Sequence, residues 1–164
     1  MSTRTLVILR HAKAANPDGV ADPDRPLSDR GQADAAAAGA WLAQSGLQPD
    51  LVLCSPALRT RQTWHAVALG LSSAPEVRYE PALYGASVRT LLASVRAATP
   101  QATTVLLIGH NPGLSALSAA LDPDHADAEG LRTAGIAVHT FTGDWTDLAT
   151  GAAPLTAAHT ARAD

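Results

Sequence analysis

Three short apolar runs constrain this chain most, because each is followed by cationic or imidazole side chains. They are LVIL at residues 6–9 before Arg10 and His11, LVL at residues 51–53 before Arg59, and VLLI at residues 105–108 before His110. Continuous apolar runs are typical of buried strands whose two faces are covered by helices. Ligands bind at the carboxyl ends of such strands in open α/β sheets. The sequence therefore predicts a sheet edge that gathers two arginines and two histidines.

The segments around these runs alternate between strand-like and helix-like patterns. We expect strands at residues 5–9, 51–54, 77–79, 103–108 and 135–141, the last of them at a sheet edge. We expect helices at residues 29–44 after a cap at Ser28 or Asp29, at 56–69, at 88–95 after a cap at Ser87, and at 112–121. Alternating strands and helices predict an α/β protein, specifically a three-layer α/β/α sandwich with a mostly parallel sheet.

Length and composition favour one domain followed by a tail. The 164 residues are enough for a sizeable core, and 46% of them are hydrophobic, which excludes a disordered chain. We expect a single domain at residues 1–145. Residues 146–164 are rich in alanine and threonine without a periodic pattern, so we expect a flexible tail there.

Charge and hydropathy narrow the classes of partner. The net charge of −3 argues against a nucleic-acid groove, which needs a basic face. No apolar stretch reaches the roughly 20 residues of a membrane span, and no signal-peptide core precedes the first strand. We therefore expect a cytoplasmic protein without membrane contact. Cys54 is the only cysteine, so no internal disulfide can form.

Two arginines and two histidines on one rim suit a phosphoryl group. Arginine binds phosphate oxygens through a planar fork that stays charged. Histidine is a usable nucleophile near neutral pH, since its free pKa is about 6.5. One histidine would attack phosphorus and the other would contact the phosphoryl oxygens, and the residue types alone do not assign these roles.

Two other phosphate-binding patterns fit less well. Cysteine phosphatases also join a cysteine to an arginine, but the segment from Cys54 to Arg59 is shorter than their loop and lacks its glycines. A small buried residue at a strand end is the better interpretation of Cys54. The GHNPG segment at residues 109–113 lacks the Gly-Lys-Ser/Thr of a nucleotide P-loop.

Four segments, in order, resemble the histidine phosphatase (phosphoglycerate mutase-like) superfamily. They are LRHAK at residues 9–13, SPALRTRQT at 55–63, IGHNP at 108–112 and RTAGIA at 132–137. The first of them, together with DRPLS at residues 24–28, is similar to the SixA-type phosphohistidine phosphatases. The resemblance implies a phosphoglycerate mutase-like fold and a hydrolase activity that uses no metal and no cofactor.

The resemblance also implies roles for individual residues. His11 would accept the phosphoryl group, and Arg10, Arg59 and His110 would bind its oxygens. The loop that follows the first strand offers three candidates for substrate contact. For Arg25, an ion pair with Asp24 or a role in shaping the groove is an alternative. These candidates are Asn16, Asp24 and Arg25.

The chain departs from the superfamily pattern at one informative position. Many relatives carry a glutamate two residues after a leucine that follows the third strand, but Leu83 is followed there by Gly85. A general acid contributes about 10²- to 10⁴-fold to cleavage of an ester, whose alkoxide leaves poorly. A protonated imidazole leaves phosphorus more readily. The missing carboxylate therefore favours phosphohistidine over phosphate esters, although Asp18, Asp24 or Glu80 stays a candidate acid.

We therefore expect a phosphatase that acts through a phosphohistidine on His11. Its expected partner is a phosphorylated protein such as a phosphorelay or phosphocarrier domain. Residues 62–77 are too few for a cap, so the site should be an open groove. The alternatives are a broad phosphomonoesterase for small phosphorylated metabolites and a non-catalytic phosphate-binding protein.

The remaining polar and aromatic residues have structural interpretations. We expect Arg61 to point away from Arg59, because residues i and i+2 do not share a helix face. We expect Trp41 and Trp64 in the core. The histidines outside the motifs, expected at the surface or in structural roles, are His65, His125, His139 and His159.

Overall fold

A six-stranded sheet runs through the middle of the computed structural model, which describes residues 2–164. The strands are β1 (Thr3–Arg10), β2 (Leu51–Cys54), β3 (Glu76–Tyr79), β4 (Thr104–Gly109), β5 (Gly135–Thr142) and β6 (Leu155–Thr160). Their order is β3-β2-β4-β1-β5-β6. The pairs β2–β3, β2–β4 and β1–β4 are parallel, whereas β5 runs antiparallel to both of its neighbours. The predicted mostly parallel sheet is confirmed.

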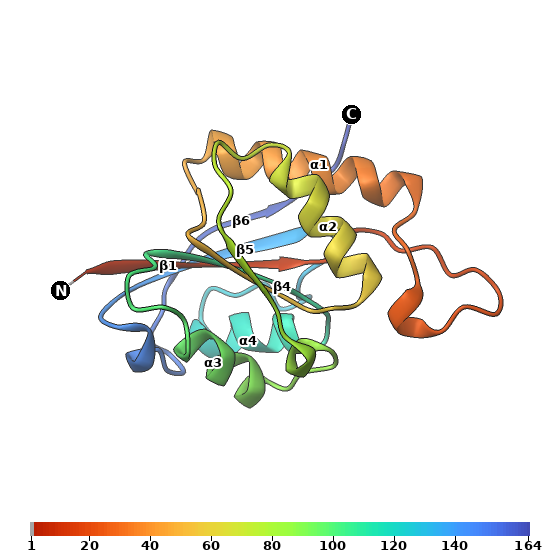
Figure 1. Ribbon diagram of the computed structural model, residues 1–164. Helices are drawn as coiled ribbons and strands as arrows, with labels where there is room; N and C mark the ends of the chain where they lie inside the picture. Colours follow the sequence, from red (N-terminus) through yellow and green to blue (C-terminus); the bar gives the residue numbers. More distant parts are fainter. Residues whose placement is uncertain (1) are drawn as a thin grey trace.

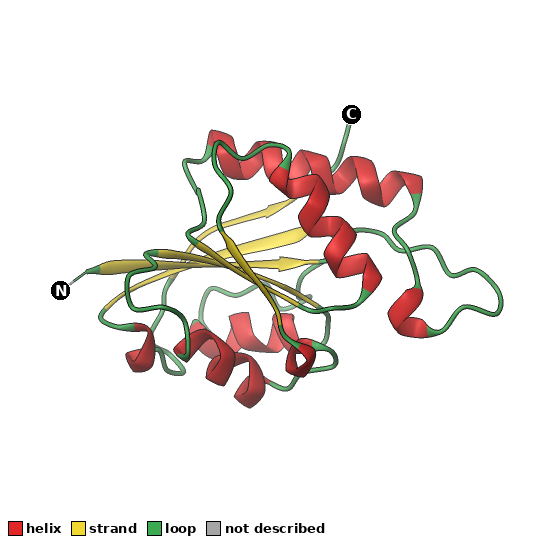
Figure 2. Cartoon of the chain, in the orientation of Figure 1, coloured by secondary structure: helices red, strands yellow, loops and turns green. Residues whose placement is uncertain are grey.

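Helices cover both faces of this sheet (Figures 1 and 2). On one face lie α1 (Asp29–Gln44) and α2 (Leu58–Ala68), and on the other lie α3 (Val88–Arg96) and α4 (Gly113–Leu121). Three short 3-10 helices, η1 (Asp22–Asp24), η2 (Pro81–Leu83) and η3 (Trp145–Asp147), lie in the connections. The arrangement is the predicted α/β/α sandwich.

Alternate residues of each central strand enter two separate cores. In β1, Val7 and Leu9 pack with the α1–α2 side, whereas Leu6 and Ile8 pack with the α3–α4 side. All four side chains are buried. Because both faces of the strand exclude water, the run is continuously apolar rather than alternating, and this is the pattern that the sequence showed.

The helix boundaries follow from local capping. The hydroxyl of Ser28 accepts a hydrogen bond from the Gly31 amide at 3.0 Å and begins α1, and that of Ser87 caps α3 in the same way. The second helix begins at Leu58 instead of Pro56. The backbone before Leu58 is extended, and the Thr60 hydroxyl contacts the carbonyls of Ser55 and Ala57, which holds this turn outside the helix.

Helices α1 and α2 approach each other closely at Gly39. A Cβ atom at this position would lie 2.4 Å from the carbonyl oxygen of Val67. Such a contact is too short for any side chain, so the helices can pack at this distance only because the residue is glycine.

The C-terminal segment differs from the expectation of a flexible tail. Residues 155–160 form β6, which pairs antiparallel with β5, so β5 is an interior strand rather than the predicted sheet edge. Ala153 and Ala161 are fully buried at either side of β6. The imidazole of His159 stacks on Trp41 of α1, with ring centroids 4.8 Å apart. Alanine and threonine differ little in hydropathy, so the sequence of this strand does not show the alternation of apolar and polar residues that would predict a strand.

Candidate active site

Three neighbouring strands deliver the polar residues to one edge of the sheet. His11 follows the last residue of β1, His110 follows β4, and Ser55 follows β2. The ladder continues one residue beyond the strands, because the amide of His11 donates to Gly109 and that of Ser55 donates to Ile108, each at 3.1 Å. Parallel pairing of β1, β4 and β2 therefore places these side chains side by side.

The ring of His11 has a defined tautomer. Its centroid lies 5.4 Å from that of His110, and the two rings are tilted by 58°. The Nδ1 atom of His11 lies 2.7 Å from the carbonyl oxygen of Ala12. A carbonyl oxygen only accepts, so Nδ1 carries the proton. The lone pair of His11 is therefore on Nε2, where it is available to attack an electrophile.

The ring of His110 is held by Ser55 through the opposite nitrogen, Nε2. Its Nε2 lies 2.8 Å from the Ser55 hydroxyl oxygen, which also accepts a hydrogen bond from the Ala57 amide. Among residues 2–164 the Ser55 hydroxyl has no other acceptor, so we assign its proton to the bond with Nε2, which places the proton of His110 on Nδ1. That Nδ1 atom is buried and has no hydrogen-bond partner. It is a donor without an acceptor.

Two arginines add further unsatisfied donors to this edge. Arg10 donates from Nη1 to the Leu131 carbonyl at 3.0 Å, and its Nε is buried without a partner. The Nε of Arg59 is also buried without a partner. Buried polar groups are rarely left unpaired in proteins, and each exception requires an explanation. We call Arg10, Arg59 and His110 the anion cradle, because their three unpaired nitrogens all suit an anionic ligand.

Burial and positive charge keep both imidazoles neutral. Burial, together with the guanidiniums of Arg59, Arg10 and Arg25, lowers the pKa of His11 to about 4, against the opposing effect of the Ala12 carbonyl. The pKa of His110 is also lowered to about 4, mainly by burial and then by His11. At neutral pH His11 is therefore a neutral imidazole, and its Nε2 lone pair is free to act as the nucleophile.

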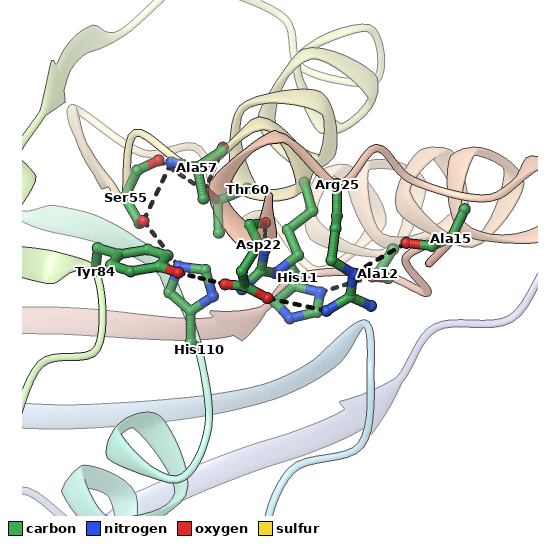
Figure 3. Close-up of polar contacts among 11 residues, drawn as sticks. His11, Ala12, Ala15, Asp22, Arg25, Ser55, Ala57, Thr60, Tyr84 and His110 are labelled. Carbon is green, nitrogen blue, oxygen red and sulfur yellow. Dashed lines mark hydrogen bonds and ion pairs between the residues drawn. The ribbon is translucent and has the colours of Figure 1, made fainter. Parts of the chain in front are cut away.

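A carboxylate lies across the mouth of this site (Figure 3). Asp22 of η1 accepts hydrogen bonds from Arg59 Nη2 at 3.0 Å, from Arg25 Nη1 at 3.2 Å, and from the Tyr84 hydroxyl. Its backbone carbonyl accepts from Arg59 Nη1 at 2.7 Å. The Tyr84 ring in turn meets the His110 ring edge-on, with centroids 5.4 Å apart.

An open groove of about 310 Å³ adjoins His110. Its lining comprises Gly85, Ala86, Ser87, Val88, His110, Asn111, Pro112, Gly113 and Ala116. No carboxylate is among these residues. A Cβ atom at Gly85 would meet nothing within 4 Å, so the chain leaves open space at this position.

Comparison with known proteins identifies the family of this site. The family model of the histidine phosphatase superfamily (branch 1) matches residues 6–87, half of the chain. The chain belongs to this superfamily. A relative from Mycobacterium tuberculosis of uncharacterised function is 41% identical over 162 residues, which cover 94% of this histidine phosphatase and 100% of the relative.

Solved structures give the same assignment. A protein from Nakamurella multipartitia, assigned as the phosphohistidine phosphatase SixA, is 37% identical with a TM-score of 0.88, and 98% of each chain is covered. The protein histidine phosphatase SixA in complex with tungstate is 28% identical with a TM-score of 0.80, and 95% of this chain and 96% of that chain are covered. The fold is therefore phosphoglycerate mutase-like, of the SixA type, and the protein is a phosphatase.

The structure brings together the four principal residues that the sequence predicted for this histidine phosphatase. His11, Arg10, Arg59 and His110 all lie at the carboxyl edge of the sheet. Sequence reasoning did not single out Asp22, Tyr84 or the role of Ser55. Ser55 lies within a recognisable motif, whereas the other two lie in connections that no motif covers.

The remaining candidates for substrate contact lie in the loop between β1 and α1. Arg25 pairs with Asp22 rather than with Asp24, and its Nε donates to the Ala15 carbonyl at 3.1 Å. Within residues 2–164, no hydrogen bond or ion pair joins the side chains of Asn16 and Asp24 to the anion cradle. Contact of these residues with a substrate stays a prediction.

Other residues that resembled site residues have structural roles. The Cys54 thiol is buried, and burial raises its pKa to about 12, so it is not a thiolate nucleophile. The Nε atom of Arg61 donates a hydrogen bond to the Pro56 carbonyl oxygen at 2.9 Å. His139 is fully buried between the Ser118 hydroxyl and a backbone carbonyl.

Glu80, a candidate acid, is bound by the Ser94 hydroxyl of α3. No helix among residues 2–164 has the length and apolar character needed to cross a bilayer. Within the same residues, no three His, Cys, Asp or Glu side chains come together as ligands for a metal ion.

Proposed function

We propose that this phosphatase hydrolyses phosphohistidine on a partner protein, through a phosphohistidine intermediate on His11. The observation that supports this choice of substrate is the absence of a carboxylic acid from the groove beside His110. An ester substrate would lose the roughly 10²- to 10⁴-fold that a general acid contributes. A phosphohistidine whose second ring nitrogen is protonated leaves as neutral imidazole and needs no acid from the enzyme.

The first step transfers the phosphoryl group to His11. Its Nε2 lone pair attacks phosphorus, and the bond from phosphorus to the substrate imidazole breaks. The three unpaired nitrogens of the anion cradle donate to the phosphoryl oxygens, which carry the charge of the transition state. The substrate imidazole departs with the electron pair of the broken bond, and its other nitrogen keeps the proton.

The second step returns His11 to its starting state. The proton stays on His11 Nδ1 throughout, hydrogen-bonded to the Ala12 carbonyl, so phosphorylated His11 is an imidazolium. Water attacks phosphorus, and His11 leaves as the neutral Nδ1–H tautomer. The products are dihydrogen phosphate and the free enzyme, and both steps proceed without a proton donated by an enzyme carboxyl group.

The openness of the site supports a protein substrate. His11 lies at a sheet edge whose neighbouring groove is formed by small residues of the loop before α3 and the start of α4. A histidine displayed on a protein surface can reach such an edge, as in a phosphorelay or phosphocarrier domain. We further propose a cytoplasmic location, which is where such domains are phosphorylated.

The test compares phosphate release from a histidine-phosphorylated protein and from a panel of phosphomonoesters. We expect a strong preference for phosphohistidine that is abolished in His11→Ala. His65→Ala is the matched control, because His65 is an exposed histidine of α2 outside the site. A preference for an ester would overturn the proposed substrate. Phosphate binding without His11-dependent turnover of either class would overturn the catalytic role.

A further inference from the structure

The carboxylate of Asp22 lies at the mouth of the active site. It belongs to η1, in the loop between β1 and α1, and its neighbours in the chain are exposed. The three hydrogen bonds from Arg59, Arg25 and Tyr84 fix the carboxylate from three separate segments. Figure 3 shows it spanning the space between Tyr84 and Arg25, beside the two imidazoles. A loop residue held in this way has a defined position.

The contacts of Asp22 leave the anion cradle available. Arg59 uses Nη1 and Nη2 for Asp22, whereas its Nε is unpaired. The Nε of Arg10 and the Nδ1 of His110 are unpaired as well. We therefore expect a phosphoryl group to bind at these donors while Asp22 remains on Arg59. The carboxylate then stands next to the bound phosphoryl group instead of replacing it.

A carboxylate beside a phosphoryl dianion requires a compensating reason, because like charges repel. Asp22 does not act as a proton donor, since hydrogen bonds from Tyr84 and Arg59 hold the pKa of its carboxyl well below its usual range. At neutral pH it is therefore an acceptor. About half of its side-chain surface is exposed (49%), so an incoming group can reach it. The ligand that suits it is an N–H group with positive charge.

Phosphohistidine carries such a group and a phosphate ester does not. When one ring nitrogen is bonded to phosphorus, the other must be protonated for the imidazole to leave as a neutral molecule. The protonated ring is an imidazolium whose N–H points away from phosphorus. A carboxylate that accepts this N–H stabilises the reactive protonation state. The departing oxygen of an ester has no proton to donate and develops negative charge, which the same carboxylate repels.

We propose that Asp22 determines substrate specificity by accepting a hydrogen bond from the imidazolium N–H of the phosphohistidine substrate. This inference rests on the proposed function and extends it to a residue that lies outside the phosphoryl-binding set. Asp22 and the Ala12 carbonyl then have matching roles. The carbonyl keeps the proton on the imidazole that receives the phosphoryl group, and Asp22 keeps the proton on the imidazole that donates it.

Asp22→Asn tests this role, because asparagine retains an acceptor oxygen for Arg59 and Tyr84 but loses the negative charge. The kcat/KM is measured with a histidine-phosphorylated protein and with p-nitrophenyl phosphate, each as a function of pH. A hydrogen bond to a charged group predicts a loss of about ten- to a hundredfold for phosphohistidine. Hydrolysis of the ester should be unchanged or faster. Asp124→Asn, an exposed carboxylate without a contact to the site, controls for net charge.

The pH profile separates this role from a purely structural one. In the wild type the carboxylate keeps the substrate imidazole protonated, so the fall in kcat/KM at high pH should begin at a lower pH in Asp22→Asn. Asp22→Glu, which keeps the charge, should retain the wild-type position of that fall even if its rate is lower. It also provides the test should the asparagine variant not fold.

The possible outcomes decide between the two proposals. Equal losses for both substrates in Asp22→Asn, without a change in the pH profile, would mean that Asp22 only anchors the loop, and the inference would be wrong. Unchanged phosphohistidine hydrolysis in Asp22→Asn would also overturn it, while leaving the proposed function intact. A wild-type enzyme that does not hydrolyse phosphohistidine would overturn the proposed function itself.

Discussion

The imidazoles of His11 and His110 lie with ring centroids 5.4 Å apart, and each is held by one neighbour through a different ring nitrogen, Nδ1 in His11 and Nε2 in His110. The Ala12 carbonyl holds a proton on Nδ1 of His11, and the Ser55 hydroxyl directs the proton of His110 to Nδ1 on that ring. One ring therefore presents a lone pair to the active site and the other presents a donor. This difference assigns the nucleophile and the oxygen-binding histidine, which the residue types alone did not.

Replacement of Ser55 tests this assignment. In Ser55→Ala the Nε2 of His110 loses its hydroxyl partner, so the ring can adopt the tautomer that lacks a donor on Nδ1. Loss of one preorganised donor costs about 10²- to 10³-fold in kcat, and we expect a smaller fall of about tenfold or more because the ring itself remains. Steady-state kinetics measures this change, with Ser73→Ala, an exposed serine, as the control. An unchanged kcat would contradict the role of Ser55.

The low pKa values of the two histidines predict an unusual acid limit. His11 attacks only when it is unprotonated, and its pKa is about 4, as is that of His110. The enzyme should therefore keep its activity as the pH falls below the ordinary histidine pKa of about 6.5, and lose it only as the pH approaches about 4. NMR titration of the ring protons, together with the pH profile of kcat/KM, measures the limit. Titration of His11 near pH 6.5 would show that burial does not control its state.

The sequence revealed those site residues that follow directly from strand pairing. His11, His110 and the arginines were predictable because each follows an apolar run or a recognisable motif, and parallel strands bring such positions to one edge. Asp22 and Tyr84 were not predictable in the same way. Their positions depend on a tertiary contact between the loop after β1, the helix that carries Arg59, and the connection after β3. Nothing in the local sequence of a loop encodes that contact.

Replacement of Gly39, at the contact of α1 and α2, should lower the stability of the fold without changing catalysis. In Gly39→Ala the added methyl group would meet the Val67 carbonyl at 2.4 Å, so the helices must separate. Overpacking of this kind costs about 1–3 kcal/mol in the free energy of unfolding. Ala36→Ser, at an exposed position of the same helix, should change stability by no more than about 0.5 kcal/mol. Denaturant unfolding measures both variants, and equal stabilities would contradict the packing argument.

Because β6 belongs to the sheet, we predict that the C-terminal segment contributes to the stability of the fold. Deletion of residues 154–164 removes β6 and leaves the edge of β5 unpaired, so the melting temperature should fall and association of the chains should increase. His159→Ala is the matched milder change, because it removes the stack on Trp41, worth about 0.5–1.5 kcal/mol, and keeps the backbone pairing. A truncated chain as stable as the full one would support the flexible tail that the composition suggested.

The failure to predict β6 has a physical cause. Its sequence, LTAAHT, contains small residues that bury little apolar area, so its order comes from backbone hydrogen bonds to β5 and from side-chain contacts with distant residues. The carboxylate of Asp122, for example, accepts the Leu155 amide at 2.8 Å. Hydropathy patterns detect side chains that leave water, and they are insensitive to a strand that is held mainly by its backbone.

The central claim, that His11 accepts the phosphoryl group, is tested most directly by trapping the intermediate. A protein labelled with ³²P on histidine is mixed with the enzyme, the reaction is quenched within milliseconds in alkali, and the labelled peptide is mapped. We predict label on His11 that is stable in alkali and labile in acid, and no labelled enzyme from His11→Ala. Label on any other residue, or release of phosphate without a labelled enzyme at any quench time, would contradict the account.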